Sequence, residues 1–119
     1  MPELGPMAWL VRKGGDVLAS AEVARGVRER TQGLLGRHVA EDVVGALVLR
    51  PCRQVHTIGM RFPIDVAFCD RDGVVLRTLT VAPWRVTRLM WRAGFVVEAA
   101  AGAFDRWQLR PGDTVEVRE

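Results

Sequence analysis

The sequence predicts a mostly β fold: a compact antiparallel barrel or sandwich of about seven short strands with one α-helix and a short helical turn. Three observations predict it. Apolar runs are short, turn residues separate them, and only one stretch has helical periodicity. A chain of 119 residues can bury one core without staples, so we expect a single domain over residues 1–119.

The chain is expected to open with a hairpin. Residues 7–12 and 17–23 have the composition of strands, and Lys13-Gly14-Gly15-Asp16 between them forms a tight turn. Because the connection is short, the two strands should pair antiparallel.

The one helix is predicted over residues 26–35. Val27, Arg30 or Thr31, and Leu34 fall on one helical stripe, and Gly36 can supply a left-handed C-cap. Arg30 therefore lies among residues that face the core.

The remaining strands are separated by proline and Asp-Gly turns. They are predicted at residues 46–49, 55–60, 64–69, 74–81, 95–99 and 114–117. Residues 55–60 and 64–69 are expected to pair as a hairpin bent at residues 61–63, and residues 70–73 form a second hairpin turn. A short helical turn at residues 103–107 precedes a Pro111-Gly112 turn.

Composition and charge exclude several classes of protein. Hydrophobic residues make up 49% and charged residues 26%, which are values of a folded domain. No apolar run reaches the roughly 20 residues of a membrane span, and no basic export signal begins the chain, so we expect a cytoplasmic protein without a membrane partner. The net charge of +3 comes mostly from scattered arginines, which favours a solvated surface over a nucleic-acid partner.

Cys52 and Cys69 are the only cysteines, and neither belongs to a CxxC or Cys/His cluster. We expect two buried reduced thiols, with no metal and no cofactor. The predicted hairpin would bring the two cysteines towards each other, which leaves a strained or transient disulfide open.

His56 is a candidate catalytic residue because an imidazole can titrate near neutral pH. Strand alternation is expected to turn His56 inward and to place Thr57, a candidate binding residue, on the opposite face. A single histidine on an apolar face is more often a hydrogen-bonded core residue. In the predicted hairpin roughly 10 Å would separate His56 from Asp65, so they are not expected to form a dyad.

Asp65 and Glu98 are the other candidate catalytic residues, and with Arg30 they are candidate binding residues. Each carboxylate shares its strand face with small apolar residues, so both are expected to be partly buried beside a cation or several hydrogen-bond donors. The guanidinium group of Arg30 could form a bidentate ion pair with either carboxylate. Such a group can hold a substrate anion, although it more often docks a helix on a sheet.

Residues 84–92 interleave tryptophans with arginines, which is the composition of a stacking platform for single-stranded RNA. A loop that covers a core with two tryptophans has the same composition, and we favour that interpretation. The sequence contains no GxGxxG, GxxxxGK[ST], HExxH or GxSxG motif, which leaves nucleotide-binding and common hydrolase mechanisms without local support.

Four blocks in order, RERTQGLLGR, VHTIGMRFPIDVAFCDRDG, VVEAAAG and RPGDTVEV, resemble domain-of-unknown-function family 192, also called uncharacterised protein family 0127. The resemblance covers nearly the whole chain and implies a small β-rich fold with one helix and no established activity, substrate or cofactor. A common form of the family reads like FWMKNTLIPLD where this chain has VHTIGMRFPID. Pro63 and Asp65 match that form, whereas a tryptophan replaces His56, which favours Arg30, Asp65 and Glu98 as site residues.

The leading hypothesis for function is a non-catalytic accessory module that binds a small molecule or a protein, in which Arg30, Asp65 and Glu98 frame a polar pocket. One alternative is a small hydrolase-like enzyme that uses Asp65 or Glu98 with Arg30. A second is weak binding of single-stranded RNA through residues 84–92. A monomer is favoured by default.

Overall fold

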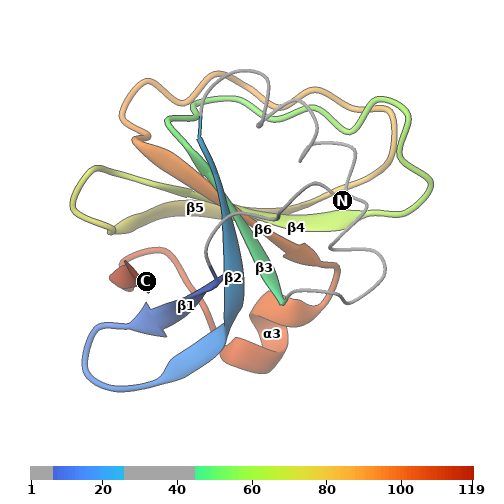
Figure 1. The fold of residues 1–119 in the computed structure, drawn as a ribbon. Coiled ribbons are helices and arrows are strands. Elements are labelled where there is room, and N and C mark those ends of the chain that lie inside the picture. The colour runs from blue at the N-terminus through green and yellow to red at the C-terminus, as the bar shows by residue number, and fades with distance from the viewer. Residues whose placement is uncertain (1–6, 26–44) are drawn as a thin grey trace.

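The computed structural model describes residues 7–25 and 45–119, and within them seven strands form one curled half-barrel sheet with a short helix beside it (Figure 1). The order across the sheet is β5-β4-β6-β3-β2-β1-β7. The elements are β1 (Met7–Arg12), β2 (Val17–Arg25), β3 (Ala46–Arg50), β4 (Ile64–Cys69), β5 (Val75–Val81), β6 (Phe95–Ala100), α3 (Ala103–Trp107) and β7 (Val115–Arg118). The predicted mostly β class is confirmed.

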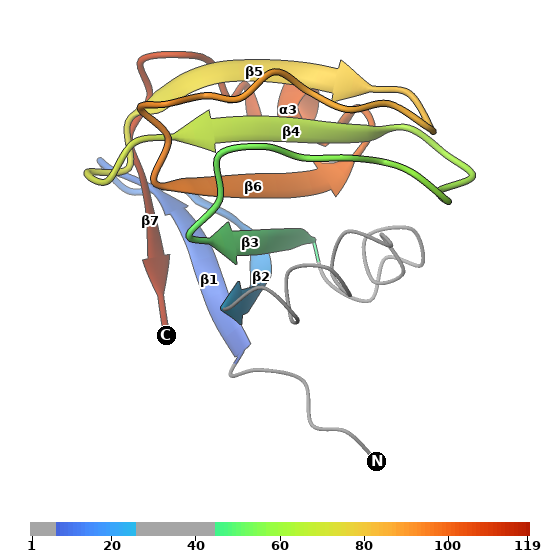
Figure 2. The ribbon, with the colours of Figure 1, turned by 90° about the horizontal axis from the view of Figure 1, so that it is seen from above.

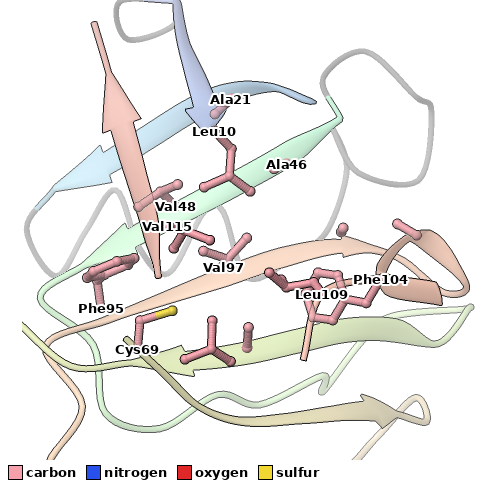
Figure 3. Packing of buried hydrophobic residues seen from close by; sticks show 14 of the residues in the cluster. Leu10, Ala21, Ala46, Val48, Cys69, Phe95, Val97, Phe104, Leu109 and Val115 are labelled. Carbon is pink, nitrogen blue, oxygen red and sulfur yellow. The ribbon is translucent and has the colours of Figure 1, made fainter. Parts of the chain in front are cut away.

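The sheet buries both of its faces, and alternation along each strand divides the core in two. On the concave face Leu10, Val97 and Val115 converge from three strands and meet Phe104 of α3 (Figure 3). Because the sheet curls, β1 and β7 cross the direction of β4 and β6 and close this side (Figure 2).

The second face carries its own cluster, in which Leu49, Val66 and Phe68 belong to the sheet. Val55 and Met60 cover them from a segment outside the named strands. The loops are therefore part of the core on this side.

The turn between β4 and β5 forms as the sequence predicts. Asp70 Oδ1 accepts hydrogen bonds from the backbone N–H groups of Asp72 and Val74, both at 2.9 Å. Gly73 has φ +89°, and a Cβ at this position would lie 2.2 Å from the carbonyl oxygen of Val115. Only glycine allows the turn to pack this closely on β7.

The predicted hairpin between residues 55–60 and 64–69 is wrong. β4 pairs with β5 along one edge and with β6 along the other, so neither edge is free for residues 55–60. These residues form no named strand. The pairing of β2 with β3 is parallel, which the long connection between them permits.

Cys52 and Cys69 are both buried and neither forms a disulfide, as expected for reduced thiols. Their side chains belong to different clusters, Cys52 to that of the second face and Cys69 to that of the concave face. The sheet therefore separates the two sulfur atoms. The predicted helix at residues 26–35 lies outside the described residues.

Candidate functional site

Asp65 lies near the start of β4 and points towards the concave face, where it is only 4% exposed. Its Oδ1 accepts a hydrogen bond from the Thr80 hydroxyl at 2.7 Å. Its Oδ2 accepts bonds from the backbone N–H groups of Gly102 at 3.0 Å and Phe104 at 3.1 Å. Burial of this carboxylate is thus offset by several donors, as the sequence predicts.

These bonds give Asp65 a structural task. Gly102 is the N-cap residue of α3 and has no side chain with which to cap the helix. Asp65 accepts from the first helical turn instead, across a gap of almost forty residues in sequence. The carboxylate fixes the helix to the sheet.

Asp65 also borders a cavity of about 300 Å³ beside α3, lined among others by Thr78, Asp105 and Arg110. Both Asp65 oxygens already accept hydrogen bonds from protein groups. Three of the roughly four acceptor positions of the carboxylate are thus used by Thr80, Gly102 and Phe104.

Glu98 lies in the middle of β6, opposite Val66 of β4 and Leu47 of β3. Its side chain is fully buried, and neither carboxylate oxygen has a hydrogen-bond partner within the described part of the chain. Burial raises the pKa of Glu98 to about 8. The carboxyl group is therefore mainly protonated at neutral pH and sealed from solvent.

The structure does not bring Asp65 and Glu98 together. Asp65 pairs with Ala99, the neighbour of Glu98, so strand alternation sends the two carboxyl groups to opposite faces of the sheet. The expected polar pocket shared by both carboxylates is therefore wrong. Arg30, which was expected to join them, and the other histidine, His38, lie outside the described residues.

The expected orientations of His56 and Thr57 are reversed. Thr57 is fully buried, and its hydroxyl donates to the carbonyl of Ala82 at 2.6 Å and accepts from the N–H of Arg85 at 2.9 Å. His56 is partly exposed, and its backbone forms an isolated bridge with Val86. Thr57 thus holds two loops together from the inside.

Those loops, residues 51–63 and 82–94, run antiparallel over the second face of the sheet, and we call them the ribbon (Figure 1). Backbone N–H groups of Thr57, Thr87 and Met90 donate across it to the carbonyls of Arg85, Val55 and Arg53, at 2.8, 2.9 and 2.8 Å respectively. The inner side of the ribbon covers the core through buried residues such as Val55 and Met60. The prediction that residues 84–92 cover the core by burying two tryptophans is wrong, because Trp84 and Trp91 are both exposed.

The outer side of the ribbon is apolar and cationic. Trp84 is 63% exposed and Trp91 is 73% exposed, although large apolar side chains are usually buried. Further exposed apolar residues are Ile58, Val86 and Leu89, and the exposed cations among them are Arg61, Arg85, Arg88 and Arg92. We call these nine residues the outer ribbon face.

The ribbon thus pairs two segments that carry exposed arginines and no carboxylates. One signal could have revealed this: the sequence has no acidic residue between Asp42 and Asp65, and none between Asp72 and Glu98. Both halves of the ribbon fall within these intervals. Pairing of the halves concentrates positive charge on one surface.

Within residues 7–25 and 45–119 no cluster of His, Cys, Asp or Glu has the makings of a metal site. No helix in this part of the chain is long and apolar enough to cross a membrane.

The chain matches the sequence profile of the DUF192 family, described as "Uncharacterized ACR, COG1430", over residues 9–117. No curated protein matches it. A crystal structure from Sinorhizobium meliloti 1021, described as a "putative transcription regulator", is similar with a TM-score of 0.74 and 22% identity over 98% of both chains. A protein of unknown function from Novosphingobium aromaticivorans DSM 12444 is similar with a TM-score of 0.72 and 20% identity, over 98% of this chain and 92% of that one. At these identities the likeness shows the fold alone.

Proposed function

This chain belongs to the DUF192 family, which is described as uncharacterised, and we propose that it is a non-catalytic binding module that docks an acidic protein through the outer ribbon face. One observation carries the proposal: the paired ribbon carries exposed tryptophans and arginines, and no acidic residue lies in either segment that builds it.

Antiparallel pairing supports a continuous surface. Val55 and Thr57 are buried, the intervening His56 is partly exposed, and Ile58 in the turn that follows is 45% exposed. The bridge between His56 and Val86 places the exposed Val86 beside them. Both halves of the ribbon thus expose apolar side chains close to this bridge.

The chemistry of this surface favours a protein over other anionic partners. Tryptophan and arginine are the residue types that most often carry binding energy in protein interfaces. Stacked bases have no use for the aliphatic side chains of Ile58, Val86 and Leu89, whereas an apolar pocket on a protein accepts them. Arginines around these anchors complement carboxylates on the partner.

We propose a non-catalytic role because both candidate catalytic carboxyl groups are buried. Asp65 is held by Thr80 and α3, and Glu98 is sealed beneath the ribbon. We also propose a cytoplasmic location, which the buried cysteines Cys52 and Cys69 support because they form no disulfide.

Photo-cross-linking in the native host tests the proposal. A photoreactive phenylalanine analogue replaces Trp84 in one variant and Trp9, which is exposed on β1, in a control variant. We expect position 84 to capture one acidic protein that position 9 does not capture. The purified pair should then bind, and Arg85→Glu with Arg88→Glu should abolish binding.

Three results would contradict the docking proposal: the same proteins captured from both positions, capture of a second copy of this chain, or no protein captured from position 84. Binding to vesicles of phosphatidylcholine and phosphatidylglycerol is measured as a further control. If the protein binds them and binding requires Trp84, the partner is a lipid surface and the docking proposal is contradicted.

Single-stranded RNA remains the second candidate, because Trp84, Trp91 and the arginines between them combine stacking surfaces with cations. The description of one structural neighbour as a "putative transcription regulator" adds a reason to test nucleic acid. Fluorescence anisotropy with a labelled oligouridine at low salt tests whether the protein binds single-stranded RNA. Saturable binding that weakens steeply with salt would support RNA, and an unchanged anisotropy would remove it.

A further inference from the structure

A second cavity of about 300 Å³ opens where the ribbon leaves β3 and returns to β6. Three arginines from separate segments line it: Arg50 at the end of β3, Arg53 in the ribbon and Arg71 in the turn between β4 and β5. We propose that this arginine cavity binds a small molecule through a phosphate group. This site is distinct from the outer ribbon face.

Backbone packing around Gly94 holds the three segments together. The Gly94 N–H donates to the carbonyl of Cys69 at 2.7 Å, and the Gly94 carbonyl accepts from the N–H of Cys52 at 3.3 Å. A Cβ at Gly94 would lie 3.1 Å from both Cα and N of Arg71. Glycine at this position therefore lets the turn that carries Arg71 close onto the base of the ribbon.

Two of the guanidinium groups are oriented by contacts that leave most of their donors available. The Arg50 guanidinium carbon lies 4.6 Å from the ring centroid of Phe95, which also lines the cavity. Arg53 donates through Nε to the carbonyl of Ala93 at 3.3 Å. Such contacts pre-organise planar forks for an oxyanion.

The positive charge of the cavity is not neutralised by the described protein. No acidic residue lines it, and none of the three arginines forms an ion pair with a carboxylate in the described ranges. The carboxylate of the nearby Asp70 instead accepts hydrogen bonds from the backbone N–H groups of Asp72 and Val74 in the same turn. Arg50 Nε is buried without a hydrogen-bond acceptor among the described residues. A bound anion would supply that acceptor and offset the mutual repulsion of the cations.

Size and charge define the ligand. Three guanidinium groups fit a group with several oxygens and more than one negative charge, which a phosphate provides. A volume of about 300 Å³ is at the lower end for small-molecule sites and suits a phosphorylated metabolite.

Isothermal titration calorimetry with pyrophosphate tests the site, and sodium chloride at matched ionic strength controls for screening. We expect saturable binding by the full chain. Arg71→Ala should weaken it by at least about tenfold, because a charged hydrogen-bond partner is lost. Arg77→Ala removes an exposed arginine of β5 outside the cavity and should leave affinity unchanged.

Arg71→Lys keeps the charge and removes the planar fork, so its affinity should fall between those of the wild type and Arg71→Ala. Thermal unfolding of each variant verifies that the fold is intact. The proposal is overturned if pyrophosphate produces no saturable heat, or if Arg77→Ala weakens binding as much as Arg71→Ala. These outcomes leave the outer ribbon face untouched, since Trp84 and Trp91 do not line the cavity.

Discussion

Thr57 Oγ1 accepts a hydrogen bond from the backbone N–H of Arg85 at 2.9 Å, so a fully buried hydroxyl joins the two halves of the ribbon. Thr57→Val keeps the shape of the side chain but leaves that N–H and the carbonyl of Ala82 without their partner. We expect the free energy of unfolding to fall by about 1–3 kcal/mol, measured by urea denaturation. Thr57→Ser retains the hydroxyl and should lose less. Equal stability of the wild type and Thr57→Val would show that the bond is dispensable.

Asp65→Ala should destabilise the fold by about 3 kcal/mol, because it removes the acceptor for Thr80 and for two N–H groups at the start of α3. Asp105→Ala, at an exposed position within α3, is the matched control and should change stability by less than about 0.5 kcal/mol. Chemical denaturation of both variants provides the comparison. Similar losses from the two substitutions would refute the anchoring role of Asp65.

Glu98 should make the free energy of unfolding decrease as the pH rises. Its pKa is about 8 in the folded chain and 4.5 ordinarily, so the folded state keeps a proton that the unfolded state releases. Its contribution to stability is fully present below pH 4.5 and is lost as the pH rises to about 8. Glu98→Gln should flatten this pH profile. At pH 8 the free energy of unfolding of the variant should exceed that of the wild type by an amount on the order of a few kcal/mol. Glu116→Gln, on β7 and half-exposed, should leave the slope unchanged; a profile of Glu98→Gln parallel to the wild type would contradict the assignment.

Alanine substitutions at Gly73 and Gly14 distinguish the cost of a steric clash from the cost of an unfavourable backbone conformation. Both have positive φ, but a Cβ at Gly73 would collide with the carbonyl of Val115 while one at Gly14 would meet nothing within 4 Å. We expect Gly14→Ala to cost about 1–2 kcal/mol from conformation alone. Gly73→Ala should cost at least about 3 kcal/mol, because the turn must also move away from β7. Differential scanning calorimetry showing equal losses would argue against the clash.

The thiol of Cys69 should be inert in the folded protein. Burial and then the neighbouring Asp70 raise its pKa to about 12, so almost no thiolate is present at neutral pH. Labelling with a thiol reagent should therefore follow global unfolding in denaturant. Rapid labelling of Cys69 in native buffer, located by mass spectrometry, would contradict its burial.

Most strands could be predicted because alternation and turn chemistry are local. The turn at residues 70–73 and the strands around it are set by Asp70, Gly73 and the apolar pattern of their neighbours. Residues 55–60 alternate similarly, yet both edges of β4 are occupied by β5 and β6. Competition for a strand edge is a property of the whole sheet and is invisible in a local pattern.

Burial of the two candidate carboxyl groups was predictable, but their partners were not. Burial of Asp65 and Glu98 follows from their small apolar neighbours, and both are buried. The partners of Asp65 are backbone N–H groups of Gly102 and Phe104, and such donors carry no residue-type signal. The pairing of the two ribbon segments was missed, because it depends on long-range backbone hydrogen bonds such as Thr57 N–H to the Arg85 carbonyl.

The most direct test of the outer ribbon face is the dissociation constant for the protein cross-linked from position 84, measured by calorimetry. The wild type is compared with Trp84→Ala/Trp91→Ala and with Trp9→Ala, whose side chain is exposed on β1. We predict that the paired ribbon substitution weakens binding by at least about thirtyfold, as loss of interface anchors does, while Trp9→Ala binds like the wild type. Equal affinity of all three proteins would contradict docking through the ribbon.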